Sequence, residues 1–277
     1  MEIFCFTEFP RIRKVKEIFG VKCGRISNKG KVRENNEDNY LLGNCINAES
    51  QDENEAHLYQ SAGHWICVGV FDGMGGEADG EVASSVAAQT FQENTMNLQI
   101  LDKDKITVLI EKTFLKANKA VIEKRKNGIS GTTGTVIATD GNQFRIFHRG
   151  DSRVYIERNK NLYVVSKDHT LAQLKMDIGI YRTSEEVLER ENHQLTQFIG
   201  MDTGGDSLPY ESSWIKWEDN DRILICSDGL YDMCAPDTIL KCLAQCSSVE
   251  KTAKLLLQHA LERGGRDNVT IAVLQRV

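Results

Sequence analysis

The chain has 277 residues, of which 40% are hydrophobic and 27% charged, a composition typical of a soluble globular protein rather than a disordered one. Its 34 Lys and Arg residues against 40 Asp and Glu residues give a net charge of −6. A basic surface for nucleic acid or for an anionic membrane is therefore not expected. No apolar run approaches the roughly 18 residues of a membrane-spanning helix, so we expect no membrane span.

The cysteines and the N-terminus bear on the cellular compartment. The 8 cysteines include no C-x-x-C pair and no histidine at zinc-finger spacing, so neither a disulfide framework nor a zinc site is predicted. Residues 1–20 alternate apolar residues with Arg and Lys and lack the apolar segment of a secretory signal. We therefore expect a protein of the reducing cytoplasm with an N-terminal extension, residues 1–20, of unassigned role.

Short strand-like segments and three amphipathic helices alternate along the chain. In chain order, the predicted elements are strands 40–42 and 64–71, helices 77–96 and 105–125, strands 133–139, 143–148, 153–158, 162–166 and 222–226, helix 249–263 and strand 269–274. Turn sequences such as Asp140-Gly141-Asn142 separate neighbouring strands closely, which indicates antiparallel hairpins. The pattern predicts an α+β fold in a single domain, with two antiparallel sheets sandwiched between pairs of helices (four layers, αββα).

Two segments interrupt this pattern. Residues 44–63 are polar and acidic, which predicts a surface excursion between strands. Residues 168–206 mix short helical pieces with several glycines. A long segment of weak regular structure is often functional, so this one is predicted to be a lid or binding flap.

Aspartates recur where predicted strands begin or end. Five residues share this placement: Asp38, Asp72, Asp151, Asp228 and Asp267. Carboxylates that converge at one edge of a sandwich repel one another unless cations lie between them. Oxygen ligands without His or Cys suit Mg²⁺ or Mn²⁺. The pattern predicts a two-metal centre that activates a bridging water for attack on phosphorus, with Arg33 as the nearest cation for phosphate oxygens.

Each of these residues also has a purely structural interpretation. An isolated Asp-Gly, as at Asp140-Gly141, is usually a turn. Asp151, in the segment HRGDSR, could cap a helix or form a local ion pair, and Arg33 alone could be a solvated surface residue. The joint pattern favours the metal site over these separate readings.

Other side chains could take part in catalysis. Ser227 precedes Asp228, but no G-x-S-x-G motif surrounds it, which favours a structural hydroxyl over a nucleophile. His148 and His169 are the general-acid candidates by neighbourhood, although hydrogen-bonded structural histidines are commoner. The glycine-rich run at residues 73–76 lacks the G-K-[ST] ending of a phosphate loop.

Seven motifs occur together in a defined order: RENNEDNY, VFDGMGG, SGTTGTV, HRGDSR, KDHT, LICSDGLYD and GGRDNVTIAVL. In this order and spacing they resemble the metal-dependent type-2C serine/threonine protein phosphatases (the PPM family). The resemblance extends over residues 21–277, which are expected to form one catalytic domain whose flap is segment 168–206. It also implies a metal site at one edge of the αββα sandwich.

The resemblance implies roles for individual residues. The metal-holding positions of the family match Asp38, Asp72, Gly73 (through its carbonyl), Asp228 and Asp267, with Asp151 joining Asp228 at a third ion. Glu37 would hold a metal-bound water, and Arg33 would contact the phosphate, so that Arg33 and Asp38 are the predicted catalytic residues. The implied cofactors are two or three Mn²⁺ or Mg²⁺ ions.

One position departs from many eukaryotic members of the family. Met74 replaces the histidine of their D-G-H-G-G motif, the general acid there, and a thioether cannot donate a proton. Met74 therefore indicates the bacterial branch and leaves the protonation of the leaving group unassigned. Residues 1–20 have no counterpart in the resemblance.

The resemblance implies hydrolysis of phosphoserine and phosphothreonine on proteins by direct attack of water, without a phosphoenzyme. The implied partners are phosphorylated substrates of a Ser/Thr protein kinase, and a monomer is expected. Two alternatives remain open: a phosphatase-like binding module without catalysis, and a regulatory phosphatase acting on anti-sigma-factor antagonists.

Overall fold

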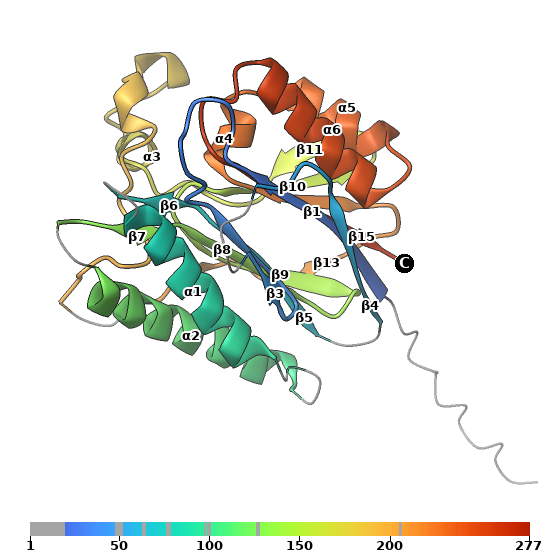
Figure 1. Cartoon of the computed structure of the whole chain (residues 1–277), viewed down its shortest axis with the longest axis horizontal. Helices are drawn as coiled ribbons and strands as arrows, with labels where there is room; N and C mark the ends of the chain where they lie inside the picture. Colours follow the sequence, from blue (N-terminus) through green and yellow to red (C-terminus); the bar gives the residue numbers. More distant parts are fainter. Residues whose placement is uncertain are drawn as a thin grey trace, which may run out of the picture.

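The computed structural model describes residues 20–47, 52–62, 65–75, 79–96, 98, 101–125, 128–204 and 207–277. Within these residues, two antiparallel sheets stack face to face (Figure 1). The first contains, in spatial order, β11 (Asn161–Val164), β10 (Arg153–Arg158), β14 (Arg222–Cys226), β15 (Val269–Arg276), β1 (Gly20–Asn28) and β4 (His57–Ala62). The second contains β12 (Tyr210–Glu211), β9 (Gln143–Arg149), β8 (Gly134–Thr139), β5 (Ile66–Phe71), β2 (Asn39–Leu42) and β3 (Cys45–Ile46), with β13 (Ile215–Lys216) also paired to β9.

Helices cover the outer face of each sheet (Figure 1). The second sheet is covered by α1 (Asp79–Thr95) and α2 (Lys103–Lys124), and the first by α4 (Asp228–Tyr231), α5 (Pro236–Gln245) and α6 (Val249–Glu262). One buried apolar cluster lies between the two sheets. A second lies between the first sheet and its helices, and a third between the second sheet and its helices. The predicted α+β, four-layer αββα fold is therefore confirmed.

Smaller elements gather at one end of the sandwich. The short ladder of β6 (Gly73–Met74) and β7 (Gly131–Thr132) lies there, beside the predicted flap (Figure 1). The flap contains α3 (Leu171–Asp177) and two 3₁₀ turns, η2 (Ser184–Glu186) and η3 (Glu189–Glu191). Its base is tied to the ladder, because Thr132 and Ile199 donate backbone hydrogen bonds to each other at 2.9 and 2.8 Å.

Several elements differ from the sequence-based expectation. The predicted surface excursion at residues 44–63 in fact supplies β3 and β4, and its polarity reflects the position of β4 at a sheet edge, largely exposed to solvent. Strand β1 was not expected, because Arg25 and its neighbours obscure the alternation of its side chains. Arg25 pairs with Glu53 and stacks over the Tyr40 ring at 4.1 Å, which allows it to lie mostly buried. Helix α5 was also missed.

The boundary of the predicted extension also shifts slightly. Residues 1–19 lie outside the described residues, but Gly20 is the first residue of β1, and its backbone exchanges hydrogen bonds with Val277 at 2.8 and 2.9 Å. The two ends of the described chain therefore meet in the same sheet, next to each other on β1 and β15.

Gly24 sets how closely α6 approaches β1. A Cβ atom at this position would lie 2.4 Å from the backbone carbon of Val249, the first residue of α6. Because backbone cannot yield as a side chain can, we expect Gly24→Ala to lower the free energy of unfolding by about 1–3 kcal/mol. Urea denaturation measures this change. Lys22→Ala on the same strand is the control, expected to shift it by about 0.5 kcal/mol or less; equal shifts for the two variants would contradict the packing argument.

Candidate metal centre

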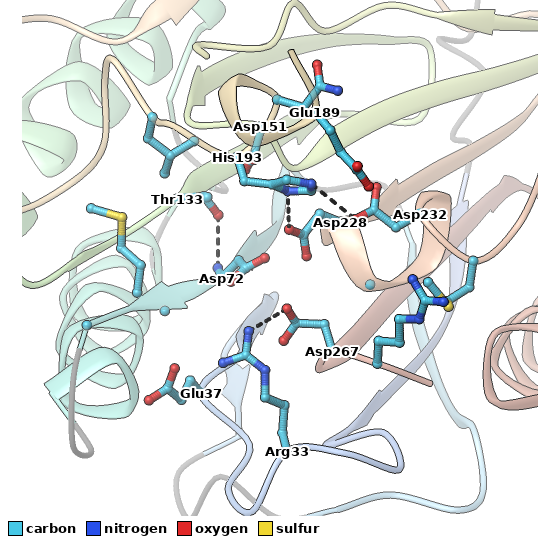
Figure 2. A pocket seen from close by; sticks show the side chains of 18 residues that line it. Arg33, Glu37, Asp72, Thr133, Asp151, Glu189, His193, Asp228, Asp232 and Asp267 are labelled. Atoms are coloured by element: carbon cyan, nitrogen blue, oxygen red, sulfur yellow. Dashed lines mark hydrogen bonds and ion pairs between the residues drawn. The ribbon is translucent and has the colours of Figure 1, made fainter. Parts of the chain in front are cut away.

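A cavity of about 710 Å³ opens at the end of the sandwich where the motif-bearing loops meet (Figure 2). Its lining includes most of the predicted site residues: Arg33, Glu37, Asp72, Gly73, Asp151, Asp228 and Asp267. They come from both sheets, because Asp72 follows β5, Asp228 begins α4 after β14, and Asp267 precedes β15. The fold thus brings together residues that lie far apart in the sequence.

Asp38 is completely buried and, unlike the other four aspartates, does not itself line the cavity. Its Oδ2 accepts a 2.8 Å hydrogen bond from Ser227 Oγ, which itself accepts one from Thr270 N at 2.9 Å. Its Oδ1 is also buried and has no hydrogen-bond partner among the described residues. An unpaired buried carboxylate oxygen is unfavourable unless a cation contacts it, so this atom fits a metal ligand. Ser227 acts here as the structural hydroxyl that orients Asp38.

Backbone contacts hold Asp72 and Gly73 in place. Asp72 N donates to Thr133 Oγ1 at 2.9 Å, and Thr132 Oγ1 donates to the Asp72 carbonyl at the same distance. At Gly73 a Cβ atom would lie 2.3 Å from the Gly80 carbonyl oxygen. The turn that carries Gly73 therefore packs so closely against α1 that only glycine fits at this position.

Asn268 fastens the loop that carries Arg33 and Glu37. Its Oδ1 accepts from Glu37 N at 2.8 Å, and its Nδ2 donates to the carbonyls of Lys29 and Asn35 at 3.0 and 2.9 Å. Arg33 Nη2 then reaches across to Asp267 Oδ2 at 2.6 Å (Figure 2). The D-N motif thus positions both a candidate ligand and the neighbouring loop.

Burial and mutual repulsion act on these carboxylates together. Burial, followed by the charges of Asp228 and Asp267, raises the pKa of Asp38 to about 7. Burial also raises the pKa of Asp72 well above its usual value, and the charge of Asp38 adds to this effect. Asp151 is raised well above its usual pKa in the same way, by burial and then by Asp228. Divalent cations would relieve this repulsion, so the charges as well as the ligand types fit metal ions.

A second group of ligand atoms lies toward the flap. One ligand atom each from Asp151, His193 and Asp228 lie within 4.8 Å of one another. Asp232, one helical turn after Asp228, lies on the other side of the His193 ring, with 3.8 Å between its Oδ2 and His193 Nε2 (Figure 2). Sequence reasoning singled out neither His193 nor Asp232. The i, i+4 spacing from Asp228 could have indicated Asp232, whereas nothing in the flap sequence distinguishes His193.

The histidines that did stand out in the sequence lie elsewhere. The rings of His148 and His169 stack with 4.8 Å between centroids, and His148 Nδ1 lies 2.8 Å from Thr135 Oγ1. Burial lowers the pKa of His148 to about 3 and that of His169 to about 4, and neither residue lines the cavity. This placement is structural rather than catalytic.

The structural roles considered for Asp140 and Asp151 can be compared with their contacts. Asp140 Oδ1 accepts from Asn142 N at 2.9 Å, as expected of a turn. Arg153 of the HRGDSR motif pairs with Asp168, 2.6 Å away, and not with Asp151. The Asp151 carboxylate receives no hydrogen bond from another residue within the described parts of the chain, and it caps no helix there.

Comparison with known proteins places the chain in a family. Residues 46–263 match the family model described as protein phosphatase 2C. The chain belongs to this family. It is 33% identical over 256 residues to the serine/threonine protein phosphatase PstP of Mycobacterium tuberculosis, covering 89% of this chain and 43% of that protein. The chain thus spans less than half the length of that relative.

Solved structures agree with the fold. A Streptococcus agalactiae serine/threonine phosphatase superposes with a TM-score of 0.79 at 22% identity, covering 92% of this phosphatase 2C family member and 99% of that chain. The catalytic domain of PstP in complex with two manganese ions superposes with a TM-score of 0.72 at 29% identity, covering 94% and 99%. Among the described residues, no helix combines the length and apolar character needed to cross a membrane.

Proposed function

We propose that this protein is a metal-dependent phosphatase that hydrolyses phosphoserine and phosphothreonine on proteins. One observation carries the proposal: a fully buried Asp38 has one carboxylate oxygen without a partner among the described residues, and it is near enough to the aspartates that line the cavity to feel their charges, in a protein phosphatase 2C fold. Membership of a family whose curated relatives are named serine/threonine phosphatases supports the reaction and the substrate class.

Mn²⁺ or Mg²⁺ is the proposed cofactor. Two ions would be held by Asp38, Asp72, the Gly73 carbonyl, Asp228 and Asp267, with a third at Asp151 and Asp228. The manganese pair in the PstP structure supports this assignment. When bound, such ions supply an activated water and neutralise charge on the phosphoryl group.

The side chains of the chain itself bind and orient the substrate. Arg33 Nη2, 2.6 Å from Asp267, presents its guanidinium at the mouth of the cavity, where it can hold two phosphate oxygens. Glu37, whose pKa is raised by burial, lies on the same loop and can accept a hydrogen bond from a water beside the phosphate. Met74 also lines the cavity and has no proton to donate, so it cannot protonate the leaving group.

Removal of Arg33 is expected to weaken substrate binding more than turnover. Charge-assisted hydrogen bonds contribute about 1.5–3 kcal/mol, so Arg33→Ala should raise KM by roughly 10- to 100-fold while kcat changes less. Steady-state kinetics with a phosphothreonine peptide measure both constants. Lys31→Ala, an exposed cation two residues away, is the control and should leave KM unchanged. An Arg33→Ala enzyme with the KM of the wild type would remove Arg33 from the phosphate site.

The proposal extends to the compartment, the oligomeric state and the substrates of the enzyme. We propose a bacterial signalling enzyme that acts in the cytoplasm, as a monomer, on substrates of a Ser/Thr protein kinase. Its cysteines support a reducing compartment, because the seven in the described residues are all free. The complete set of candidate ligands supports an enzyme over a binding module without catalysis, and the names of the relatives support a general protein phosphatase over one dedicated to anti-sigma-factor antagonists.

Matched phosphopeptides test the proposed function. Peptides identical except for phosphoserine, phosphothreonine or phosphotyrosine are incubated with the protein and Mn²⁺, and released phosphate is measured. The proposal predicts turnover of the first two, and its abolition by EDTA. Hydrolysis of the phosphotyrosine peptide alone, or hydrolysis unaffected by EDTA, would contradict it, and no hydrolysis of any peptide would favour the binding module.

A further inference from the structure

The flap, residues 168–206, touches the cavity through a small set of side chains. Glu189, Asn192, His193 and Leu195 line it together with the sheet-edge aspartates. Figure 2 shows the His193 ring above Asp228 and beside Asp151. His193 is thus a metal-ligand type from the flap that lies next to candidate ligands from the sandwich.

The geometry suits a shared ion. His193 Nδ1 lies 3.6 Å from Asp228 Oδ2, and the ligand atoms of Asp151, His193 and Asp228 all lie within 4.8 Å of one another. Two ligands of one tetrahedral cation, each about 2.0–2.2 Å from it, lie roughly 3.3–3.6 Å apart. Side-chain shifts of up to about one ångström would therefore let one ion contact all three.

Two further observations indicate a ligand at this point. Asp151 is only 5% exposed, and within the described residues its carboxylate accepts a hydrogen bond from its own backbone N–H but none from another residue, so it has capacity left for a cation. On the other side of the imidazole, Asp232 Oδ2 lies 3.8 Å from Nε2. This distance is longer than a hydrogen bond, but a small approach would place a carboxylate on the second nitrogen, which is the usual support for a metal-bound histidine because it holds the proton there and leaves the lone pair of Nδ1 for the ion.

We propose that His193 completes the third cation site with Asp151 and Asp228, and that this site favours borderline cations such as Zn²⁺ or Co²⁺ over Mg²⁺. This inference rests on the proposed function, which contains the third site but gives it oxygen ligands only. Imidazole suits Zn²⁺ and Co²⁺, whereas Mg²⁺ prefers oxygen. The two all-oxygen sites and the His193 site thus differ in chemistry.

Ligation by His193 has a mechanical consequence. Asp151 and Asp228 belong to the sandwich, whereas His193 belongs to the flap, so an ion bound to all three fixes the flap over the cavity. A cation that binds only this arrangement stabilises it by mass action, which makes opening of the flap about tenfold rarer when the free ion is at ten times its dissociation constant. Occupancy of the third site would then control access to the cavity.

Two measurements test the site without using activity. In the first, full-length ¹⁵N-labelled protein preloaded with Mg²⁺ is titrated with Zn²⁺, and the histidine side-chain nitrogens are followed by NMR, with His193 assigned from its absence in His193→Asn. In the second, trypsin cleavage after Arg182 and Arg190, both exposed flap residues, is timed with and without Zn²⁺. The variants are His193→Ala and His193→Asn, and His259→Ala, which removes an imidazole from α6, is the matched control.

The proposal predicts that Zn²⁺ shifts the Nδ1 resonance of His193 and slows cleavage in the flap about tenfold in the wild type and in His259→Ala, but not in the His193 variants. An unmoved His193 resonance, or equal protection in the His193 variants, would overturn it. Either His193 variant can supply the assignment of the His193 resonance, so the NMR result on the wild type stands even if one of the two fails to fold. Phosphopeptide turnover with Mn²⁺ is measured separately. Turnover together with an unmoved His193 resonance would refute the His193 site but not the proposed phosphatase activity. A shifted His193 resonance without turnover would refute the phosphatase activity but not the His193 site.

Discussion

Asp228→Asn is expected to lower kcat/KM for a phosphothreonine peptide by about a thousandfold or more at saturating Mn²⁺. Asp228 faces both groups of candidate ligands, the one around Asp72 and the one around Asp151, and its charge acts on both carboxylates. A neutral amide removes that charge and weakens the hold on the ions. Metal ions contribute several kcal/mol to such transition states, and each 1.36 kcal/mol corresponds to about a factor of ten in rate.

The same substitution should have the opposite effect on the metal-free fold. Asp228 adds to the repulsion that raises the pKa of Asp38 beyond the effect of burial, so Asp228→Asn should make the EDTA-treated protein more stable to urea. Asp237→Asn, at the exposed start of α5, is the control and should alter neither quantity. Loss of activity together with loss of metal-free stability would instead indicate a folding defect and contradict the assignment of Asp228 as a ligand.

Stability of the metal-free protein is expected to fall as the pH rises from about 4 to about 7. The pKa of Asp38 is about 7 in the folded protein, chiefly through burial, against about 3.9 in an unfolded chain. Between these values the folded state binds the extra proton, so its advantage is complete below about pH 4 and is lost as the pH passes through 7. Three pKa units correspond to a loss on the order of 4 kcal/mol.

Urea denaturation across this pH range, with EDTA or with saturating Mn²⁺, measures the effect. Cations in the cluster compensate the carboxylate charges, so the protein with Mn²⁺ should not lose stability over this range. Asp38→Asn in EDTA is the control for the residue and should show a smaller slope, and the slope that remains should come from Asp72 and Asp151, whose pKa values burial also raises. A metal-free protein whose stability increases with pH would show that the buried carboxylates do not repel one another as described.

Much of the fold could be predicted because its strands carry strong local signals. The turn at Asp140-Gly141 joins β8 and β9 as expected, and Gly141 has the positive φ of 83° that such a turn requires. The elements that were missed depend on tertiary contacts instead. The side chain of Arg25 in β1 is buried only because Glu53 and Tyr40 meet it there. Helix α5 is an exception, because Pro236 at its first turn was an available signal.

In the candidate site, too, some residues could be predicted from local sequence and others depend on tertiary contacts. Each aspartate of the predicted cluster lies beside a strand and within a recognisable motif, so its placement follows from the sheet, and the structure brings all five to one end of the sandwich. His193 lies in a loop of the flap with no periodicity around it, and its proximity to Asp228 depends on how the flap folds back. Its position could be found only in three dimensions.

Anomalous diffraction from crystals grown with Mn²⁺ tests the central claim most directly, since it locates the ions without reference to activity. The account predicts two neighbouring anomalous peaks in the cavity, about 2.0–2.6 Å from carboxylate oxygens of Asp38, Asp72, Asp228 and Asp267. Peaks elsewhere on the surface, with none among these four residues at saturating Mn²⁺, would contradict it.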